Sequence, residues 1–181
     1  MNTRELALFP FVPELKRLGV RSYKIEGRMK SIHYVASTVA FYRQVLNGTT
    51  FSEEEGMALL NRISNRGYSY GFMKGGITPE DYATSQRQST SFARFVGDVM
   101  DRTDEDHVLI NVRNTIHAGE TLEVLMPSGQ LTNIVLPEIL TLSDHTKVKT
   151  ANHGMFIQLQ ADLPLFSIFR RVDHSSSIGN T

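Results

Sequence analysis

A polar stretch, TPEDYATSQRQST (residues 78–90), divides the chain into two parts whose apolar residues follow different periods. Apolar residues before this stretch recur at helical spacings, whereas those after it alternate with polar residues as they do in strands. The 181 residues of the chain are enough for two small domains. We therefore predict one domain over residues 1–77, a linker over residues 78–90 and a second domain over residues 91–172.

The first part begins with the order of elements that is typical of a β/α unit. An apolar run over residues 6–11 predicts the end of a buried strand, and Pro13 and Gly19 bound a short helix. Residues 20–27 (VRSYKIEG) then alternate as a second strand. The tight connection predicts that the two strands pair in parallel.

Two longer helices are predicted to follow. Ser31 is a predicted N-cap, and the apolar residues behind it lie one, three and four positions apart until Asn47 and Gly48 end the helix. Ser52 and Glu55 have the spacing of a capping box, which predicts another helix from Ser52 to about residue 64.

Short alternating runs separated by turn signals fill the second part of the chain. Six or seven strands at this spacing predict a small antiparallel barrel or sandwich, so the predicted fold class is α+β. The last residues, 173–181, have the composition of a disordered tail. The predicted strands cover residues 92–100, 107–113, 120–126, 131–136, 146–150, 155–160 and 165–170.

Several kinds of protein are excluded by what the sequence lacks. The chain has no cysteine, which excludes disulfides, thiol catalysis and cysteine-bound clusters within it. It has neither an apolar run of about eighteen residues nor a signal-peptide pattern, so we expect a cytoplasmic location and no membrane partner. None of its six histidines forms a helical metal-binding pair, and no metal site is predicted.

Charge is unevenly distributed, although the whole chain is formally neutral. Residues 1–90 carry a net charge of +4 and residues 91–172 a net charge of −3. Seven basic residues and one acid lie within residues 16–43. Such a surface can contact phosphate, although a solvated helix face gives the same count. The basic residues predicted to bind RNA are Lys16, Arg17, Lys30 and Arg66.

The segment YKIEGR contains the candidate catalytic residues. Alternation along a strand puts Lys24 and Glu26 on one face, at the strand end where a β/α barrel has its active site, and Arg28 follows on the next loop. Such a set can hold an anion, orient a carboxyl group or move a proton. Spacing alone favours a structural ion pair or a solvated strand face over a functional site.

Three motifs resemble the collagenase-like peptidase family, the U32 peptidases. They are YKIEGRMKSIHYVASTVAFYRQVLNG at residues 23–48, ISNRGYSYGFMKG at residues 63–75 and, more loosely, NTIHAGETLEVLMPSGQ at residues 114–130. The resemblance covers about residues 1–171. It is nearest to the subgroup that acts in the 5-hydroxylation of wobble uridine in tRNA.

The resemblance implies that the chain is the C-terminal fragment of a longer protein. It would contain the last β/α units of a truncated β/α barrel, followed by a small antiparallel β-barrel. Lys24, Glu26 and Arg28 would then lie at the mouth of the last barrel strand, and tRNA would be a partner. Cysteines that bind an iron–sulfur cluster in relatives lie upstream, so this chain would carry no cofactor and would be inactive alone.

Two other functions remain open at this point. One is a peptidase whose C-terminal region binds substrate, as the family name suggests. The other is a non-catalytic assembly module that binds other protein subunits. The unpaired strand edges of a truncated barrel also predict self-association of the fragment.

Overall fold

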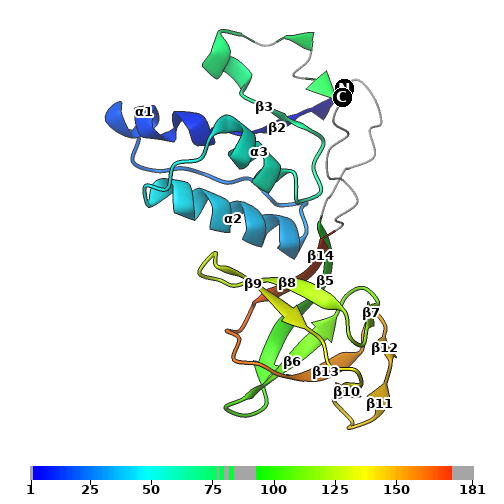
Figure 1. The fold of residues 1–181 in the computed structure, drawn as a ribbon. Helices are drawn as coiled ribbons and strands as arrows, with labels where there is room; N and C mark the ends of the chain where they lie inside the picture. The colour runs from blue at the N-terminus through cyan, green and yellow to red at the C-terminus, as the bar shows by residue number, and fades with distance from the viewer. Residues whose placement is uncertain (1, 77, 80–81, 84–92, 173–181) are drawn as a thin grey trace, which may run out of the picture. The chain divides into compact units, whose positions relative to one another are not determined.

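The chain divides into two compact units, residues 1–92 and residues 93–181. The computed structural model describes residues 2–76, 78–79, 82–83 and 93–172, and Figure 1 shows their elements as a ribbon. The predicted tail lies outside the described residues, as does most of the predicted linker over residues 78–90. The part of the linker that is described includes one short strand, Tyr82–Ala83.

Helices and short strands build the first unit (Figure 1). Its elements are β1 (Asn2–Thr3), β2 (Glu5–Leu6), the 3-10 helix η1 (Phe9–Phe11), α1 (Val12–Arg17), α2 (Ile32–Leu46), α3 (Glu53–Leu60), β3 (Tyr68–Ser69), the 3-10 helix η2 (Gly71–Lys74) and β4 (Tyr82–Ala83). β1 pairs antiparallel with β4, and β2 pairs in parallel with β3.

The longer helices begin where their capping residues predict. The Ser31 side chain accepts a hydrogen bond from the Tyr34 backbone N–H at the start of α2. Ser52 and Glu55 form the predicted capping box of α3, in which each side chain accepts from the other residue's backbone N–H. α3 ends at Leu60, about four residues before the predicted end, because the chain turns there through two hydrogen bonds of the 3-10 type.

The core of the first unit joins η1 to the two longer helices. Phe9 packs edge-to-face against Phe41 of α2, with ring centroids 5.3 Å apart. It also lies against α3 at Gly56, where an added Cβ would come within 2.3 Å of the Phe9 ring. The glycine therefore permits a close approach that any other residue would block. The buried apolar residues of this core are Ala7, Phe9, Val12, Phe41, Val45 and Leu60.

The strand predicted over residues 20–27 is wrong, because this segment is in no strand of the described chain. An extended segment becomes a strand only when its backbone groups pair with a neighbour. β2 is paired instead with β3, and the Glu5 and Ala7 amides donate to the Gly67 and Ser69 carbonyls at 2.9 Å. The parallel pairing that the sequence predicts is present, but with a partner more than sixty residues away in the chain.

The second unit is almost entirely β-structure. Its strands are β5 (Ala93–Arg102), β6 (His107–Val112), β7 (Ile116–His117), β8 (Thr121–Leu125), β9 (Leu131–Val135), β10 (Leu140–Leu142), β11 (Lys147–Val148), β12 (Thr150–Ala151), β13 (Phe156–Gln160) and β14 (Ile168–Val172). Eight of them form one antiparallel sheet in the order β11-β10-β13-β6-β5-β14-β8-β9, and β12 pairs separately with β7.

The antiparallel sheet is curled into a half-barrel around one core (Figure 1). Its end strands, β11 and β9, do not pair with each other among the described residues. Val99, Ile110, Leu122, Ile157 and Phe169 are among the fully buried residues that fill it. The predicted α+β class is confirmed, with helices followed by a curled antiparallel sheet. The short strands β7 and β10 were not predicted.

Candidate functional site

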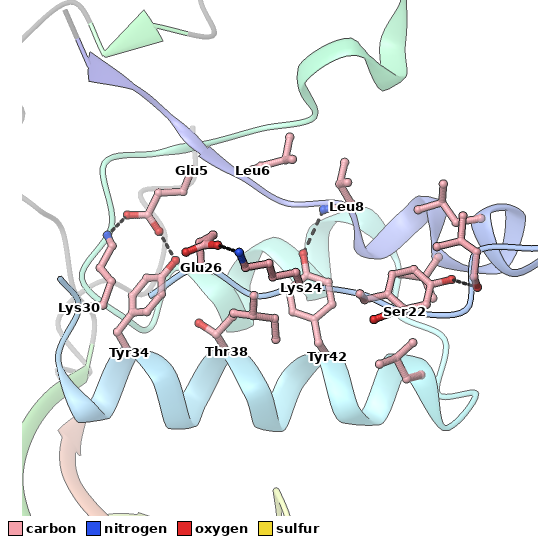
Figure 2. A pocket seen from close by; sticks show the side chains of 16 residues that line it. Glu5, Leu6, Leu8, Ser22, Lys24, Glu26, Lys30, Tyr34, Thr38 and Tyr42 are labelled. Carbon is pink, nitrogen blue, oxygen red and sulfur yellow. Dashed lines mark hydrogen bonds and ion pairs between the residues drawn. The ribbon is translucent and has the colours of Figure 1, made fainter. Parts of the chain in front are cut away.

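A pocket of about 580 Å³ opens in the first unit between β2, residues 20–26 and α2 (Figure 2). Apolar side chains make up most of its wall, including Leu6, Leu8, Val20 and Leu46. Mostly apolar pockets of roughly 300–1,000 Å³ with a few convergent polar groups are typical of ligand sites. The size and lining of this pocket therefore suit a small molecule or a single ring system.

The polar end of the pocket is formed by Glu5, Lys30 and Tyr34 (Figure 2). The Tyr34 hydroxyl donates to Glu5 Oε2 at 2.5 Å, and the Lys30 ammonium pairs with Glu5 Oε1. Lys30 Nζ also lies 4.4 Å from the centre of the Tyr34 ring. The Glu5 side chain is only 12% exposed, so these two donors compensate for the loss of water around its charge. We call these three residues the inner cluster.

The hydroxyl groups that face the pocket come from one side of α2. Tyr34, Thr38 and Tyr42 are four residues apart, so their side chains lie above one another on the helix (Figure 2). The Tyr42 hydroxyl accepts from the Leu8 backbone N–H at 3.0 Å. The Thr38 hydroxyl is buried close enough to the Tyr34 hydroxyl to lower its pKa, and it meets the geometry of a hydrogen bond with no residue in the described part of the chain.

Burial controls the acidity of the tyrosines at this site. Removal of water raises the pKa of Tyr34, and its hydrogen bond to the Glu5 carboxylate raises this pKa further. Burial likewise raises the pKa of Tyr42, which also lines the pocket. Both hydroxyls therefore stay protonated at neutral pH and can act as hydrogen-bond donors.

The candidate catalytic residues are only partly brought together. Lys24 Nζ lies 2.6 Å from Glu26 Oε1, and both residues line the pocket. Their side chains are 83% and 72% exposed, so this ion pair is formed in solvent. Arg28 is exposed and does not line the pocket. A catalytic role for the three residues stays a prediction.

The four basic residues predicted to bind RNA occupy three places in the first unit. Lys16 and Arg17 are in the last turn of α1, where Lys16 donates to the Leu46 carbonyl at 2.6 Å and Arg17 pairs with Glu14 at 3.4 Å. Lys30 belongs to the inner cluster. Arg66 is exposed in the loop before β3. Three of the four therefore already have partners, and RNA binding by them stays a prediction.

Glu5, Tyr34 and Thr38 were not among the site residues predicted from the sequence. The four-residue spacing of three hydroxyl-bearing residues on one apolar helix was the available signal. Glu5 lies 29 residues before Tyr34, and no local pattern joins them.

Three other properties bear on what the chain can bind or do. Within the described ranges, no group of three or more His, Asp or Glu side chains is placed to hold a metal ion. The chain has no cysteine, so its own residues do not fit an iron–sulfur cluster. None of the described helices is both long enough and apolar enough to cross a membrane.

The fold and the pocket define a two-unit α+β protein, in which a helical unit with a ligand-sized pocket precedes a curled β unit. Family comparison gives the particular class. Residues 1–82 match the model of peptidase family U32, and residues 93–170 match that of the peptidase family U32 C-terminal domain. The two matches cover most of the chain and fall on its two units. The chain belongs to peptidase family U32.

Among its relatives are bacterial proteins named tRNA hydroxylation protein P. The Haemophilus influenzae protein is 31% identical over 170 residues, which are 88% of this chain and 35% of that protein. The Escherichia coli protein is 31% identical over 141 residues, which are 72% of this chain and 30% of that protein. The chain thus spans about a third of the length of these relatives.

A solved structure, the C-terminal domain of a U32 peptidase of Geobacillus thermoleovorans, is also similar. It is 17% identical with a TM-score of 0.38, and the match covers 43% of this chain and 99% of that domain.

Proposed function

We propose that the chain is the C-terminal part of a protein that hydroxylates uridine in tRNA. The observation that carries this proposal is the similarity to tRNA hydroxylation protein P, which extends over 88% of the chain in the Haemophilus influenzae relative. The substrate would be tRNA, and the location would be the cytoplasm. Because the chain covers about a third of such relatives, the activity belongs to the whole protein.

The first unit would provide the contacts to tRNA. Lys16, Arg17 and Arg66 have exposed side chains and would pair with phosphates. Lys24 and Glu26 would act at the rim of the pocket because they line it, and Arg28 would act from the exposed segment that follows them. Any iron–sulfur cluster of the whole protein would be ligated outside residues 1–181, since these contain no cysteine.

A chimaera tests this function directly. The region of the Escherichia coli relative that matches this chain is replaced by residues 1–181, in cells that lack the native gene. We expect mass spectrometry of tRNA nucleosides to show hydroxylated uridine restored. A chimaera that is expressed and folded but leaves uridine unmodified contradicts the proposal.

The RNA contacts have a test of their own. Arg17→Ala with Arg66→Ala in the chimaera should weaken tRNA binding and reduce its dependence on salt, because each lost phosphate contact lowers the salt slope by about one. Glu54→Gln is the matched control, because it changes the charge of an exposed residue on α3 without removing a cation. An unchanged salt slope would exclude these two residues from the RNA interface.

Peptidase activity is the second candidate, because both family models carry that name. Incubation of the chimaera with gelatin and unstructured peptides tests it. Cleavage that is lost in the Glu26→Gln variant would favour this candidate over tRNA hydroxylation.

A further inference from the structure

The inner cluster and Thr38 retain hydrogen-bonding capacity that the fold does not use. Each Glu5 carboxylate oxygen accepts one hydrogen bond, from Lys30 or from Tyr34, and has a second lone pair. Lys30 has three N–H donors and gives one of them to Glu5. The buried Thr38 hydroxyl lines the pocket beside the Tyr34 hydroxyl and meets the geometry of a hydrogen bond with no described residue. A ligand can bind all three groups without breaking an existing bond.

Charge at the pocket selects the kind of ligand. Glu5 is balanced by Lys30, and Lys24 is balanced by Glu26, so the pocket-lining residues bring no excess of positive charge. A phosphate or a carboxylate would need such an excess to replace its lost hydration. Apart from Ser22 and Thr38, the remaining lining is apolar or aromatic, including the Tyr23 ring. A neutral, planar ring with a polar edge therefore suits the pocket better than an anion does.

The order of donors and acceptors then selects among such rings. We propose that the pocket binds the uracil base of an unpaired uridine in RNA, with Glu5 accepting from the ring N3–H. Lys30 and Thr38 donate to the two ring carbonyl oxygens that flank this N–H. The proposal rests on the proposed function and assigns the residues that recognise the base.

Cytosine does not fit the same arrangement. Its exocyclic amino group is a donor where uracil has the O4 acceptor, and its ring N3 accepts where uracil donates. Two of the three contacts would therefore place like groups against each other, with Glu5 facing an acceptor. Enzymes that act on a base take it out of the stack into such a pocket, which explains why an unpaired uridine is needed.

Thr38 gives the proposal a test that separates binding from folding. A buried hydroxyl without a partner destabilises the fold, so the isosteric variant Thr38→Val should unfold at a higher urea concentration than the wild type. The same change removes one donor to the base. A purely structural role predicts no effect on base discrimination.

The experiment uses the full chain and two labelled seven-nucleotide RNAs, AAAUAAA and AAACAAA, titrated by fluorescence anisotropy. We expect tighter binding of the uridine RNA, and Thr38→Val should weaken that binding about five- to tenfold, as expected for one lost hydrogen bond. Binding of the cytidine RNA should not change. Thr132→Val, in β9 of the second unit, is the matched control and should alter neither affinity. Competition by free uridine separates recognition of the base from contacts to the RNA backbone.

Other outcomes overturn the assignment. Equal affinity for the two RNAs, no binding of either, or a uridine preference unchanged by Thr38→Val each contradicts it. If the chimaera nevertheless hydroxylates tRNA, the proposed function stands and only the pocket assignment falls. If uridine is preferred through Thr38 but the chimaera leaves tRNA unmodified, the pocket assignment stands and the proposed function falls.

Discussion

Burial should make the inner cluster far more important for stability than a chemically identical cluster at the surface. The first unit contains a second set of the same three residue types, Glu53, Tyr70 and Lys74, which we call the surface cluster. Tyr70 Oη donates to Glu53 Oε1 at 2.5 Å, and Lys74 Nζ lies 3.1 Å from the same oxygen and 4.1 Å from the centre of the Tyr70 ring. The bonds match those of the inner cluster, but Glu53 and Lys74 are more than half exposed.

Two double-mutant cycles compare these clusters. The first combines Glu5→Ala with Tyr34→Phe, and the second combines Glu53→Ala with Tyr70→Phe. A buried hydrogen bond to a charged group contributes about 1.5–3 kcal/mol, so we expect a coupling free energy in that range between Glu5 and Tyr34. Water competes for the groups of the surface cluster, so its cycle should show no measurable coupling.

Urea unfolding followed by tyrosine fluorescence measures both cycles in the full chain. All six tyrosines lie in residues 1–92 and the chain has no tryptophan, so the signal reports on the first unit alone. Coupling between Glu5 and Tyr34 no greater than that between Glu53 and Tyr70 would refute the reasoning. Burial would then not be what makes the inner cluster different.

Four further predictions concern the first unit. The pKa of Tyr34 in the folded state is raised above the value of about 10 for an unfolded chain. The stabilisation of the fold by protonated Tyr34 is therefore complete below pH 10 and is lost as pH rises above it. Above pH 10 the urea midpoint should fall less steeply with pH in Tyr34→Phe than in the wild type. Equal pH slopes of the two midpoints would contradict this. Gly56→Ala should destabilise the unit by about 1–3 kcal/mol in urea unfolding, despite the better helix propensity of alanine, because the new Cβ would meet the Phe9 ring; an unchanged midpoint would show that the ring moves freely. Lys24→Ala and Glu26→Ala should each change stability by less than about 1 kcal/mol because the pair is exposed, and a larger loss would indicate a buried pair. We also expect the chain to self-associate in sedimentation velocity, and a monomer at every concentration would contradict that expectation.

Local signals in the sequence were sufficient to predict where the two longer helices begin. Ser31 at the start of α2 and the Ser52–Glu55 box at the start of α3 act within one turn of the chain, so the residues that decide each boundary are adjacent in sequence. The longer strands of the second unit could be predicted equally well from their alternating runs, because each strand buries one face in a common core. Strands β7 and β10 were not predicted, because two or three residues are too few to show the alternation of a strand.

Pairing between distant segments could not be predicted from the sequence in the same way. Residues 20–27 alternate as a strand, but alternation states only which side chains share a face and not whether a neighbour is present. Likewise, the contact between Glu5 and Tyr34 depends on how β2 lies over α2 and not on any spacing. The inner cluster and the surface cluster contain the same residue types, so only the fold shows which of them is buried.

The Thr38 hydroxyl is a group that the fold does not require and that a ligand could use. Its neighbours along the helix, Tyr34 and Tyr42, both form hydrogen bonds through their hydroxyls, to Glu5 and to Leu8. The Thr38 hydroxyl is buried beside them without a bond from any described residue. Valine has the same shape and no polar atom, so stability alone favours valine at this position. The free energy of unfolding that threonine loses relative to valine is recovered only when something in the pocket accepts a hydrogen bond from Thr38. The Thr38→Val variant therefore tests the pocket more directly than a change at any charged residue.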